Sequence, residues 1–381
     1  MSEMSYLEKL LDGVEVEWLP LGHIAAIKTG QSVNKNMISK NPGVYPVINS
    51  GREPLGFINT WNTDNDPIGI TTRGAGVGSV IWQEGKYFRG NLNYSITIDK
   101  KNHINIRYMY HALLHMKNDI HELCTFDGIP ALNAGSLKKL LIPIPCPDNP
   151  EKSLAIQSEI VRILDKFTEL TAELTAELTA ELSMRKKQYN YYRDQLLNLE
   201  GRENTREMRI GDIYDFQYGT GNTIPKSGGQ YPVYGSNGIV GSHDKYNSED
   251  SPVIGHIGAY AGIVNWGQGK HFVTYNGVIC RHKSKEVLQK YAYYLLLLQD
   301  FGSKSNSASQ PFVSYNILNA PIVLVPPLQE QARIVAILDK FDTLTNSITE
   351  GLPREIELRQ KQYEYYRDLL FSFPKPETAS N

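Results

Sequence analysis

Apolar residues recur at steps of three and four along two stretches of the chain, and this spacing predicts two long amphipathic helices. The stripe of the first helix consists of Ile156, Ile160, Ile163, Phe167, Leu170, Leu174, Leu178 and Leu182. The stripe of the second consists of Ile334, Ile337, Phe341, Leu344 and Ile348. An isolated amphipathic helix gains little stability in water, so each stripe needs a partner. Two arrangements are open: each helix packs on its own domain, or the two helices pack on each other.

The two stretches are copies of each other. QSEIVRILDKFTELT from Gln157 matches QARIVAILDKFDTLT from Gln331, and RKKQYNYYRDQLL from Arg185 matches RQKQYEYYRDLLF from Arg359. Both pairs have the same offset (331 − 157 = 174 and 359 − 185 = 174). The first stretch contains the tandem TAEL-TAEL-TAEL at 171–182, whereas the second contains GLP at 351–353. Proline removes a helical hydrogen bond, so a kink or break is expected in the second helix only.

The regions that precede the helices are rich in short apolar runs bounded by Gly, Asn and Pro, which predict strands at 44–48, 68–72, 77–82 and 95–98. Helices are expected at 107–116 and 287–299. The two regions also match each other loosely, since LPLGHIAAIKTG parallels MRIGDIYDFQYG and IPALNAGSLKKLLIPIP parallels QPFVSYNILNAPIVLVP. The predicted fold class is therefore α+β: two similar, mixed, strand-rich domains separated by two long antiparallel coiled-coil helices with pseudo-twofold symmetry. The predicted boundaries are 1–150, 151–200, 201–326 and 327–374, in the order domain, central helix, domain, C-terminal helix.

Composition and charge narrow the class of protein to which the chain can belong. The chain has 381 residues, of which 41% are hydrophobic and 21% charged, as in ordinary globular proteins. Its net charge of −2, without a basic block, argues against strong DNA binding by the chain alone. The three cysteines are far apart, which predicts no disulfide framework or zinc site and favours a reducing cytoplasm. No apolar run approaches the roughly 18 residues of a membrane span, and the acidic N-terminus does not have the pattern of a signal peptide.

The order of domain, helix, domain, helix resembles that of the specificity subunits of type I restriction-modification enzymes. The resemblance is carried by LPLGHIAAIKTG, PALNAGSLKKLLIPIP, QSEIVRILDKF, QARIVAILDKF, the TAEL tandem and the two QYxYYRD endings. It implies that each domain is a target recognition domain that reads one half of a bipartite DNA site, with the helices as a fixed spacer and a docking surface for two methyltransferase subunits. It also implies restriction/translocase subunits as partners. S-adenosylmethionine, ATP and Mg would then act in the partner subunits, with no cofactor in this chain.

A search for catalytic motifs favours a non-catalytic subunit. An adenine methyltransferase needs an Asp/Asn-Pro-Pro-aromatic loop, and the nearest segment, DNPE at 148–151, lacks it. The chain has no GxxxxGK[ST] phosphate loop, and His111 and His115 lack the glutamate of HExxH. A weak nuclease pattern at Asp66, Glu84 and Lys86 loses its second acid in the copy. Two alternatives stay open: a helical interaction scaffold that does not read DNA, and an independent enzyme.

Arg, Lys, Asn and Gln side chains read base edges, and domains that read different sequences should differ at the reading positions. The predicted DNA-binding residues of the first domain are Asn34, Lys35, Arg52, Arg73, Arg89, Asn91 and Asn93. Those of the second domain are Lys226, His256, Tyr260, Tyr275, Asn276, Lys304, Asn306 and Gln310. The tyrosines near the helix ends are either a stacking platform for bases or a partner-docking surface. Docking is favoured, with the residues Tyr189, Tyr192, Arg193, Tyr363, Tyr366 and Arg367.

Overall fold

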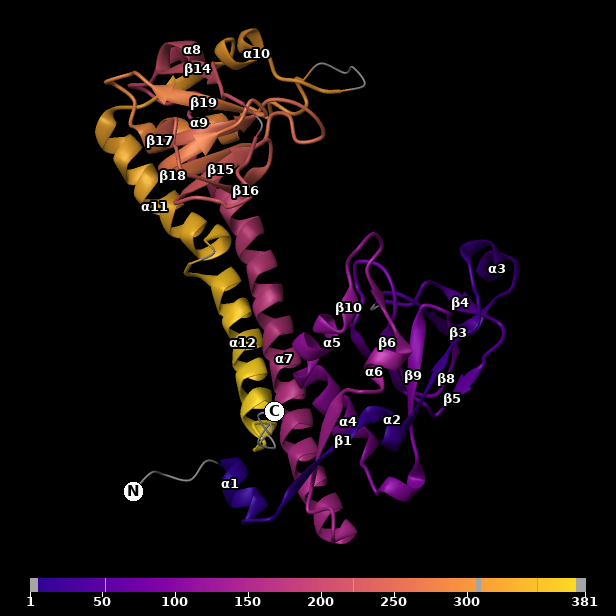
Figure 1. Ribbon diagram of the computed structural model, residues 1–381. Helices are drawn as coiled ribbons and strands as arrows, with labels where there is room; N and C mark the ends of the chain where they lie inside the picture. Colours follow the sequence, from indigo (N-terminus) through magenta and orange to yellow (C-terminus); the bar gives the residue numbers. More distant parts are fainter. Residues whose placement is uncertain (1–5, 52, 222, 306–309, 348, 375–381) are drawn as a thin grey trace. The chain divides into compact units, whose positions relative to one another are not determined.

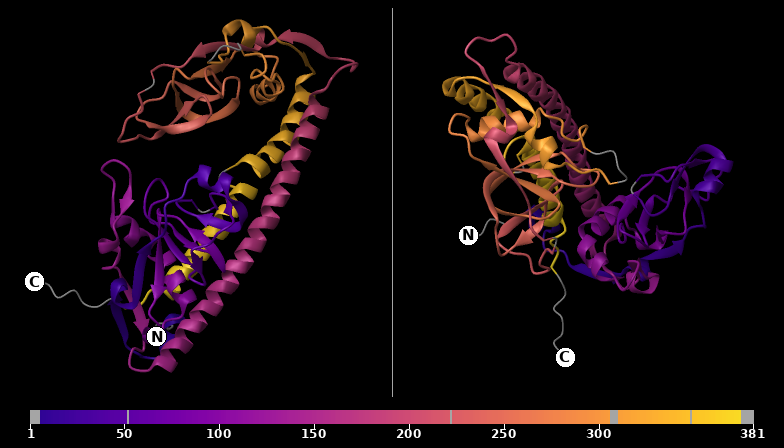
Figure 2. Two further views of the ribbon diagram at one scale, coloured as in Figure 1. Left: turned by 90° about the vertical axis from the view of Figure 1, so that its right-hand side faces the viewer. Right: turned by 90° about the horizontal axis from the view of Figure 1, so that it is seen from above.

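The computed structural model of the protein describes residues 6–51, 53–221, 223–305, 310–347 and 349–374. The chain forms two compact units (Figure 1): unit 1 contains Met1–Glu177 and Ile356–Asn381, and unit 2 contains Leu178–Glu355. The helix α7 (Pro150–Leu197) contributes residues to both units and is unbroken in each view (Figure 2). No helix in the described part of the chain is long and apolar enough to span a membrane.

Unit 1 contains two four-stranded sheets, with strand orders β2-β9-β6-β7 and β4-β3-β8-β5, and two strand pairs, β1-β12 and β10-β11. Its strands are β1 (Val16–Pro20), β2 (Ala25–Thr29), β3 (Pro42–Ile48), β4 (Phe57–Ile58), β5 (Thr63–Asp64), β6 (Ile68–Thr71), β7 (Val80–Trp82), β8 (Lys86–Arg89), β9 (Asn93–Ile98), β10 (Cys124–Thr125), β11 (Ala131–Leu132) and β12 (Leu141–Pro145). Its helices before α7 are α1 (Tyr6–Leu11), α2 (Leu21–Ile24), α3 (Lys35–Lys40), η1 (Lys100–Asn102), α4 (Ile106–His115), α5 (Lys117–Glu122) and α6 (Ala134–Leu137). The strands and the helix predicted for this region are confirmed.

Unit 2 contains a six-stranded sheet with the order β14-β19-β17-β18-β15-β16 and the strand pair β13-β20. Its strands are β13 (Arg206–Arg209), β14 (Tyr214–Tyr218), β15 (Tyr231–Gly235), β16 (Gly238–His243), β17 (Ser248–Gly255), β18 (Val264–Val273), β19 (Gly277–His282) and β20 (Ile322–Val325). Its helices are α8 (Ile210–Ile213), α9 (Gln289–Leu297), α10 (Tyr315–Asn319) and α11 (Leu328–Asn346), followed by α12 (Leu352–Leu370), which begins in unit 2 and continues into unit 1. The predicted helix at 287–299 is confirmed as α9.

The strand pairings of the two units are equivalent, which confirms the duplication at the level of the fold. In each unit the entry strand pairs antiparallel with the exit strand, as β1 with β12 and β13 with β20. The antiparallel pairs β2-β9, β6-β9 and β6-β7 recur as β14-β19, β17-β19 and β17-β18. Even the parallel pair is repeated, with Val47 opposite Phe88 and Val233 opposite Phe272.

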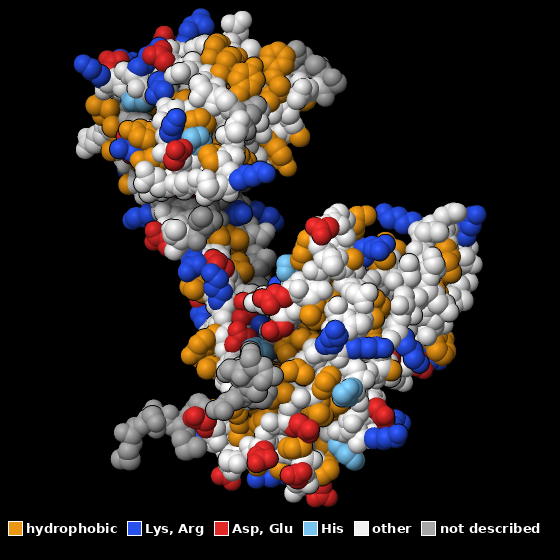
Figure 3. Space-filling view, viewed as in Figure 1, with side chains coloured by type: hydrophobic (Ala, Val, Ile, Leu, Met, Phe, Trp, Pro, Cys, Tyr) orange, Lys and Arg blue, Asp and Glu red, His pale blue; other side chains and the backbone are white. Residues whose placement is uncertain are grey.

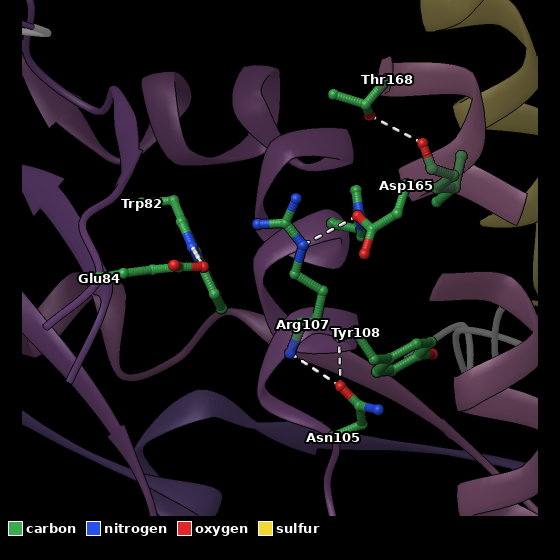
Figure 4. Close-up of polar contacts among 9 residues, drawn as sticks. Trp82, Glu84, Asn105, Arg107, Tyr108, Asp165 and Thr168 are labelled. Atoms are coloured by element: carbon green, nitrogen blue, oxygen red, sulfur yellow. Dashed lines mark hydrogen bonds and ion pairs between the residues drawn. The ribbon is translucent and has the colours of Figure 1, made fainter. Parts of the chain in front are cut away.

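The side chain of Arg107 connects a strand of unit 1 to the helix α7. Arg107 of α4 donates from Nε to Oδ1 of Asp165 at 2.9 Å (Figure 4), and its Cζ lies 4.5 Å from the centroid of the Trp82 ring. The same carboxylate oxygen lies 2.8 Å from Nε2 of the fully buried His111. Burial lowers the pKa of His111 and outweighs the opposite effect of Asp165. Asp165 therefore fixes how α7 sits against α4.

Unit 2 repeats this junction with different residue types. Nζ of Lys290 lies 4.0 Å from Oδ1 of Asp339 on α11 and 4.0 Å from the centroid of the Trp266 ring. Tyr294, the counterpart of His111, donates from its hydroxyl to the same Asp339 oxygen at 2.5 Å. A cation–π contact and an ion pair to one helical carboxylate thus set the register of each domain on its helix.

The beginning of each long helix packs on its own domain. Ile156, Ile160 and Leu164 of α7 are buried in one cluster with Tyr108 and Ala112 of α4. The equivalent residues of α11, such as Ile334 and Leu338, are buried in one cluster with residues of α9. The arrangement in which each helix packs on its own domain is therefore correct for these segments.

Further along, the helices also contact each other within each unit. In unit 1 the ring of Phe167 on α7 stacks on Tyr366 of α12, with centroids 4.8 Å apart. In unit 2 the ring of Phe341 on α11 stacks on Tyr192 of α7, with centroids 5.7 Å apart. Phe341 and Tyr366 are the copies of Phe167 and Tyr192 (341 − 167 = 174 and 366 − 192 = 174). Each unit therefore makes the same contact, with the roles of the two helices exchanged.

The second long helix is broken where the GLP sequence predicts it. The helix α11 ends at Asn346 and α12 begins at Leu352, whereas α7 is continuous. Gly351 has φ +82°, and a Cβ there would lie 2.4 Å from the carbonyl oxygen of Thr343 and 2.8 Å from that of Leu344. Glycine is therefore required, and Pro353 is tolerated because the first turn of a helix needs no amide donor. Ile348, the last residue of the predicted stripe, lies outside the described residues.

Replacing Gly351 with alanine is expected to destabilise the α11–α12 junction by about 3 kcal/mol, from left-handed strain together with the collision with two carbonyl oxygens. Gly201→Ala is the matched control, because Gly201 has φ +74° but open space around its Cβ. The Gly201→Ala variant should lose only about 1 kcal/mol of unfolding free energy. Hydrogen exchange of the α11 and α12 amides measures the junction, and equal losses in both variants would contradict the steric argument.

Candidate nucleic-acid interface

Four segments of unit 1 meet at one place, which we call the loop end of unit 1: residues 29–31, 72–79, 90–93 and 128–134. Backbone hydrogen bonds join them. The amide of Thr72 donates to Leu92 O at 2.9 Å, and Thr72 O accepts from the amide of Leu132 at 2.8 Å. The amide of Gly74 donates to Pro130 O at 2.9 Å. Residues 73–79 are thus held between the segment that follows β8 and the segment that contains β11.

The loop end of unit 2 consists of residues 218–220, 256–263, 274–276 and 310–315, and it has the same backbone connections. His256 replaces Thr72: its amide donates to Asn276 O at 2.8 Å, and its carbonyl accepts from the amide of Val313 at 2.9 Å. The amide of Gly258 donates to Pro311 O at 2.8 Å, as Gly74 does to Pro130. One backbone scaffold therefore presents different side chains in the two units.

The glycine-rich run in unit 1, residues 74–78, is a turn between β6 and β7. Gly74 and Gly78 have φ +91° and +78°, and their counterparts Gly258 and Gly262 both have φ +88°. Only the first and last glycines of the run are therefore required by the backbone. Because the turn occupies residues up to Ser79, β7 begins at Val80, later than the predicted start at residue 77.

Acidic residues are absent from long stretches of sequence around both loop ends. Residues 67–83, 85–98, 128–147, 251–285 and 301–329 contain no Asp or Glu. The chain as a whole has a net charge of −2, so its carboxylates are concentrated elsewhere. An acid-free surface avoids repulsion by phosphates, which dominate protein–DNA electrostatics.

The predicted residues of the first domain fall into four groups. Arg73 and Asn91 are exposed at the loop end. Asn34 and Lys35 are exposed at the start of α3, which follows the loop-end segment 29–31, and Asn34 caps this helix by accepting from the amide of Met37 at 2.8 Å. Arg52 lies outside the described residues.

The remaining two predictions in this domain, Arg89 and Asn93, are wrong because both side chains are buried. The Arg89 guanidinium donates to Asn93 Oδ1 at 2.5 Å, to Asp66 O at 2.7 Å, to Tyr94 O at 3.2 Å and to the hydroxyl of Tyr87. Arg89 is 3% exposed and Asn93 is fully buried, and burial lowers the pKa of Arg89. These side chains hold β8 and β9 together from within the domain.

In the second domain, Tyr260, Tyr275 and Gln310 are exposed at the loop end, and Asn276 is half-buried there. Lys304 is exposed, and Gly302 beside it lies against Gly262 of the loop end. Lys226 is exposed in the loop before β15, outside the loop end. Asn306 lies outside the described residues.

A direct base contact by His256 is contradicted by its burial. The side chain is 5% exposed, and its Nδ1 lies 3.2 Å from Val313 O. Burial lowers the pKa of His256, which favours its neutral imidazole. It packs within a cluster of aromatic rings that also contains Tyr218, Tyr275 and Tyr315. Two of these rings, Tyr218 and Tyr315, were not predicted from the sequence, although their counterparts Thr29 and Ala134 differ from them as the variability criterion requires.

The predicted docking residues are mostly occupied within the protein. Tyr189 is buried in the core of unit 2, which contradicts its docking role. Tyr192 and Tyr366 stack on the opposite helix, Arg193 and Arg367 pair with the neighbouring aspartates, and Tyr363 is half-buried. The exposed members of the two tyrosine clusters are Tyr191, Tyr192 and Tyr365, so the docking role predicted for Tyr192 remains open.

The weak catalytic patterns do not form sites. His111 and His115 pair with different carboxylates, Asp165 and Asp368, each at 2.8 Å. The Glu84 carboxylate accepts a hydrogen bond from Trp82 Nε1 at 2.9 Å (Figure 4). Within the described ranges, no three His, Cys, Asp or Glu side chains are grouped to hold a metal ion. Each histidine is therefore engaged by a carboxylate of the same unit.

Comparison with known proteins identifies the family. The profile described as "Type I restriction modification DNA specificity domain" matches twice, at residues 13–184 and 202–358. The chain belongs to this family. The two matches coincide with the two repeats, so each repeat is one specificity domain followed by part of its helix.

Two relatives of this family from Escherichia coli are similar over nearly their whole length. The EcoR124I/EcoR124II specificity subunit is 40% identical over 422 aligned positions, with all of both chains covered. The EcoprrI specificity subunit is 36% identical, with 92% of this chain and 93% of the relative covered.

Solved structures of the family share the fold. A type I restriction-modification S subunit from M. genitalium aligns over 98% of this chain and all of its own, with a TM-score of 0.50 and 21% identity. A chain from a study of the assembly and conformational transition of the type I system aligns over 93% of this chain and 97% of its own, with a TM-score of 0.59 and 14% identity.

Proposed function

We propose that this chain is the DNA-reading, non-catalytic specificity subunit of a type I restriction-modification complex, and that each loop end reads one half of a bipartite site. The observation that carries the proposal is the pair of loop ends, in which equivalent backbone hydrogen bonds hold different side chains on segments that contain no Asp or Glu. A shared scaffold with divergent side chains is what two readers of different sequences need. Phosphate contacts position such readers, and base contacts specify them.

Two domains that each bind DNA weakly can bind a bipartite site tightly when they are on one chain, even though the net charge of the chain is −2. When one half-site is bound, the second contact becomes intramolecular, and the combined affinity exceeds that of either reader alone. The helix α7 contributes to both units without a break, and its 48 residues correspond to a length of about 72 Å. Its length and twist would then set the spacer between the half-sites.

Two methyltransferase subunits and the restriction/translocase subunits complete the proposed complex. S-adenosylmethionine, ATP and Mg act in those partners, which therefore carry out methylation and cleavage. We place the complex in the cytoplasm, a location supported by three free cysteines, two of them buried. The docking surfaces are the exposed apolar faces formed by Met184 and Tyr191 on α7 and by Leu358 and Tyr365 on α12.

These faces have the properties that two copies of one partner require. Each of the four side chains is between 41% and 62% exposed. The residues of each pair are seven positions apart, which places them on the same side of the helix. The two faces are copies of each other (358 − 184 = 174 and 365 − 191 = 174), so a partner that fits one also fits the other.

Tyr191→Ala is expected to weaken the binding of one methyltransferase subunit by about 30-fold, which is typical of an aromatic hot spot. Tyr365→Ala should weaken the other equally, and the double variant should lose both. Native mass spectrometry of the assembled complex counts the bound subunits. Tyr246→Ala, which removes an exposed tyrosine outside the helices, is the control. If the double variant still binds two methyltransferase subunits, the assigned faces are wrong.

The proposed function is tested by incubating the chain, assembled with its methyltransferase subunit, with random duplex DNA at fixed salt and sequencing the bound fraction. Enrichment of a split motif with a constant unread spacer supports the specificity role. Binding without sequence enrichment favours the alternative, an interaction scaffold, for which the net charge of −2 is the supporting observation.

A further inference from the structure

Four aromatic rings form a continuous cluster at the loop end of unit 2. Tyr218 stacks on Tyr315, with centroids 4.2 Å apart and planes 16° apart, and it lies 4.2 Å from the ring of His256. His256 meets Tyr275 edge to face at 5.5 Å. The amide of Tyr218 donates to the hydroxyl of Tyr315 at 2.9 Å. These contacts hold the rings in fixed positions before any ligand binds.

The outer rings of this cluster face solvent. Tyr275 is 48% exposed and Tyr315 is 36% exposed, and Tyr260 and Ile263 of the adjoining turn are also exposed. Figure 3 shows hydrophobic side chains gathered on this part of unit 2, beside α10. Exposed apolar patches of this kind mark interaction sites. Tyrosine is well suited to such sites because it combines a large apolar ring with little rotamer freedom.

The equivalent positions of unit 1 carry no rings. Thr29, Thr72, Asn91 and Ala134 occupy the places of Tyr218, His256, Tyr275 and Tyr315. The backbone around them is the same, as the repeated hydrogen bonds of Thr72 and His256 show. The two loop ends therefore differ in surface chemistry, because only the loop end of unit 2 carries the aromatic cluster. Unit 1 presents Arg73 and Asn91, whereas unit 2 presents an uncharged ring surface.

The major groove of DNA contains one apolar group, the C5-methyl of thymine; its other distinguishing groups are hydrogen-bond donors and acceptors. A neutral aromatic surface makes favourable contact with that methyl group. It also leaves donors and acceptors of other bases unpaired, which disfavours those bases. Because residues 251–285 contain no acid, phosphates flanking such a contact meet no repulsion from this segment.

On the basis of the proposed function, we infer that the exposed rings of Tyr275 and Tyr315, which Tyr218 and the buried His256 hold in place, read thymine methyl groups in the major groove of the half-site bound by unit 2. The half-site bound by unit 1 is read by polar side chains instead, with Arg73 and Asn91 as the exposed groups. The target is therefore asymmetric in chemistry: one half depends on thymine methyl groups, and the other does not.

The test uses the complete complex and its enriched target. Deoxyuridine replaces thymidine throughout one half-site at a time, which removes only the C5-methyl groups and keeps every hydrogen-bonding group. In the half-site bound by unit 2, affinity should fall by about fourfold for each contacted methyl group. In the other half-site it should stay within a factor of about two. The half-site whose recognition changes in the Tyr275→Asn complex is the one assigned to unit 2.

Tyr275→Asn and Tyr315→Ala introduce the residues that unit 1 has at these positions, so they suit the shared scaffold. In these variants the loss of affinity caused by deoxyuridine in the half-site bound by unit 2 should disappear. The unfolding midpoint should stay unchanged, and so should the affinity measured with deoxyuridine in the half-site bound by unit 1. The inference is overturned if neither half-site changes in Tyr275→Asn, if deoxyuridine has no effect, or if the penalty persists in both variants. Failure of the unmodified complex to enrich any split motif would instead overturn the proposed function.

Discussion

Deleting residues 171–174, one TAEL tetrad of α7, is expected to change the preferred spacer between the half-sites while leaving both half-site sequences unchanged. Four residues correspond to about 6 Å of helix and about 400° of rotation, so the helix shortens and turns by about 40°. At about 3.4 Å per base pair, the preferred spacer should shrink by one or two base pairs. Affinity for the original site should fall by about 100-fold or more, because the two readers no longer engage together.

The tetrad is a suitable target because Leu174 is exposed and the helix is continuous on both sides of it. Enrichment from random DNA, repeated with the deletion complex, measures the spacer and the half-sites in one experiment. A variant with the sequence of this tetrad scrambled, at constant length, is the control and should keep the original spacer. A changed half-site sequence, or an unchanged spacer, would show that α7 does not set the separation.

Arg89→Ala is expected to destabilise unit 1 by about 3–5 kcal/mol, because it removes one partner from a buried, charged network. The side chains of Asn93 and Tyr87 and the carbonyl oxygens of Asp66 and Tyr94 would each lose a donor. Hydrogen exchange of the β8 and β9 amides, compared with amides of unit 2, measures this local loss. Any loss of DNA affinity in this variant should result from unfolding of unit 1. DNA affinity should therefore be restored at low temperature or with an added stabilising osmolyte, because both favour the folded unit.

Arg73→Ala provides the contrast, since Arg73 is exposed at the loop end of the same unit. Its removal should leave the stability of unit 1 within about 0.5 kcal/mol. It should lower specific affinity by about 10-fold and relax one position of the half-site. The assignment of Arg89 to the core and Arg73 to the surface fails if Arg89→Ala leaves amide protection intact, or if Arg73→Ala destabilises the unit.

The two arginines show how far the candidate site could be predicted. Both lie in polar, glycine-containing segments, and residue type and neighbours alone do not separate them. Arg89 is the last residue of β8 and points inward, where Asn93 and Tyr87 satisfy it. Arg73 follows β6 by two residues and lies on the turn. The direction of a side chain at a strand end depends on strand register, and that register is fixed by contacts distant in sequence.

The tyrosine clusters show the same limit. The matched QYxYYRD endings identified both clusters, but the sequence did not show which ring faces which neighbour. Tyr189, Tyr191 and Tyr192 differ by only one or two positions, yet one is buried, one is exposed and one stacks on Phe341. Each residue turns a helix by about 100°, so the face that meets a neighbour depends on where that neighbour lies.

The sequence by itself determined the duplication, the constant offset between the helices, the continuity of α7 and the break at Gly351-Leu352-Pro353, because repeats, periodicity and backbone restrictions are local properties of the chain. Only the tertiary structure decided that each helix first packs on its own domain and then contacts the other helix. It also decided which polar side chains lie inside and that four rings meet at one loop end. These outcomes depend on bringing segments separated by tens of residues into contact, and local sequence does not encode the direction from which a partner arrives.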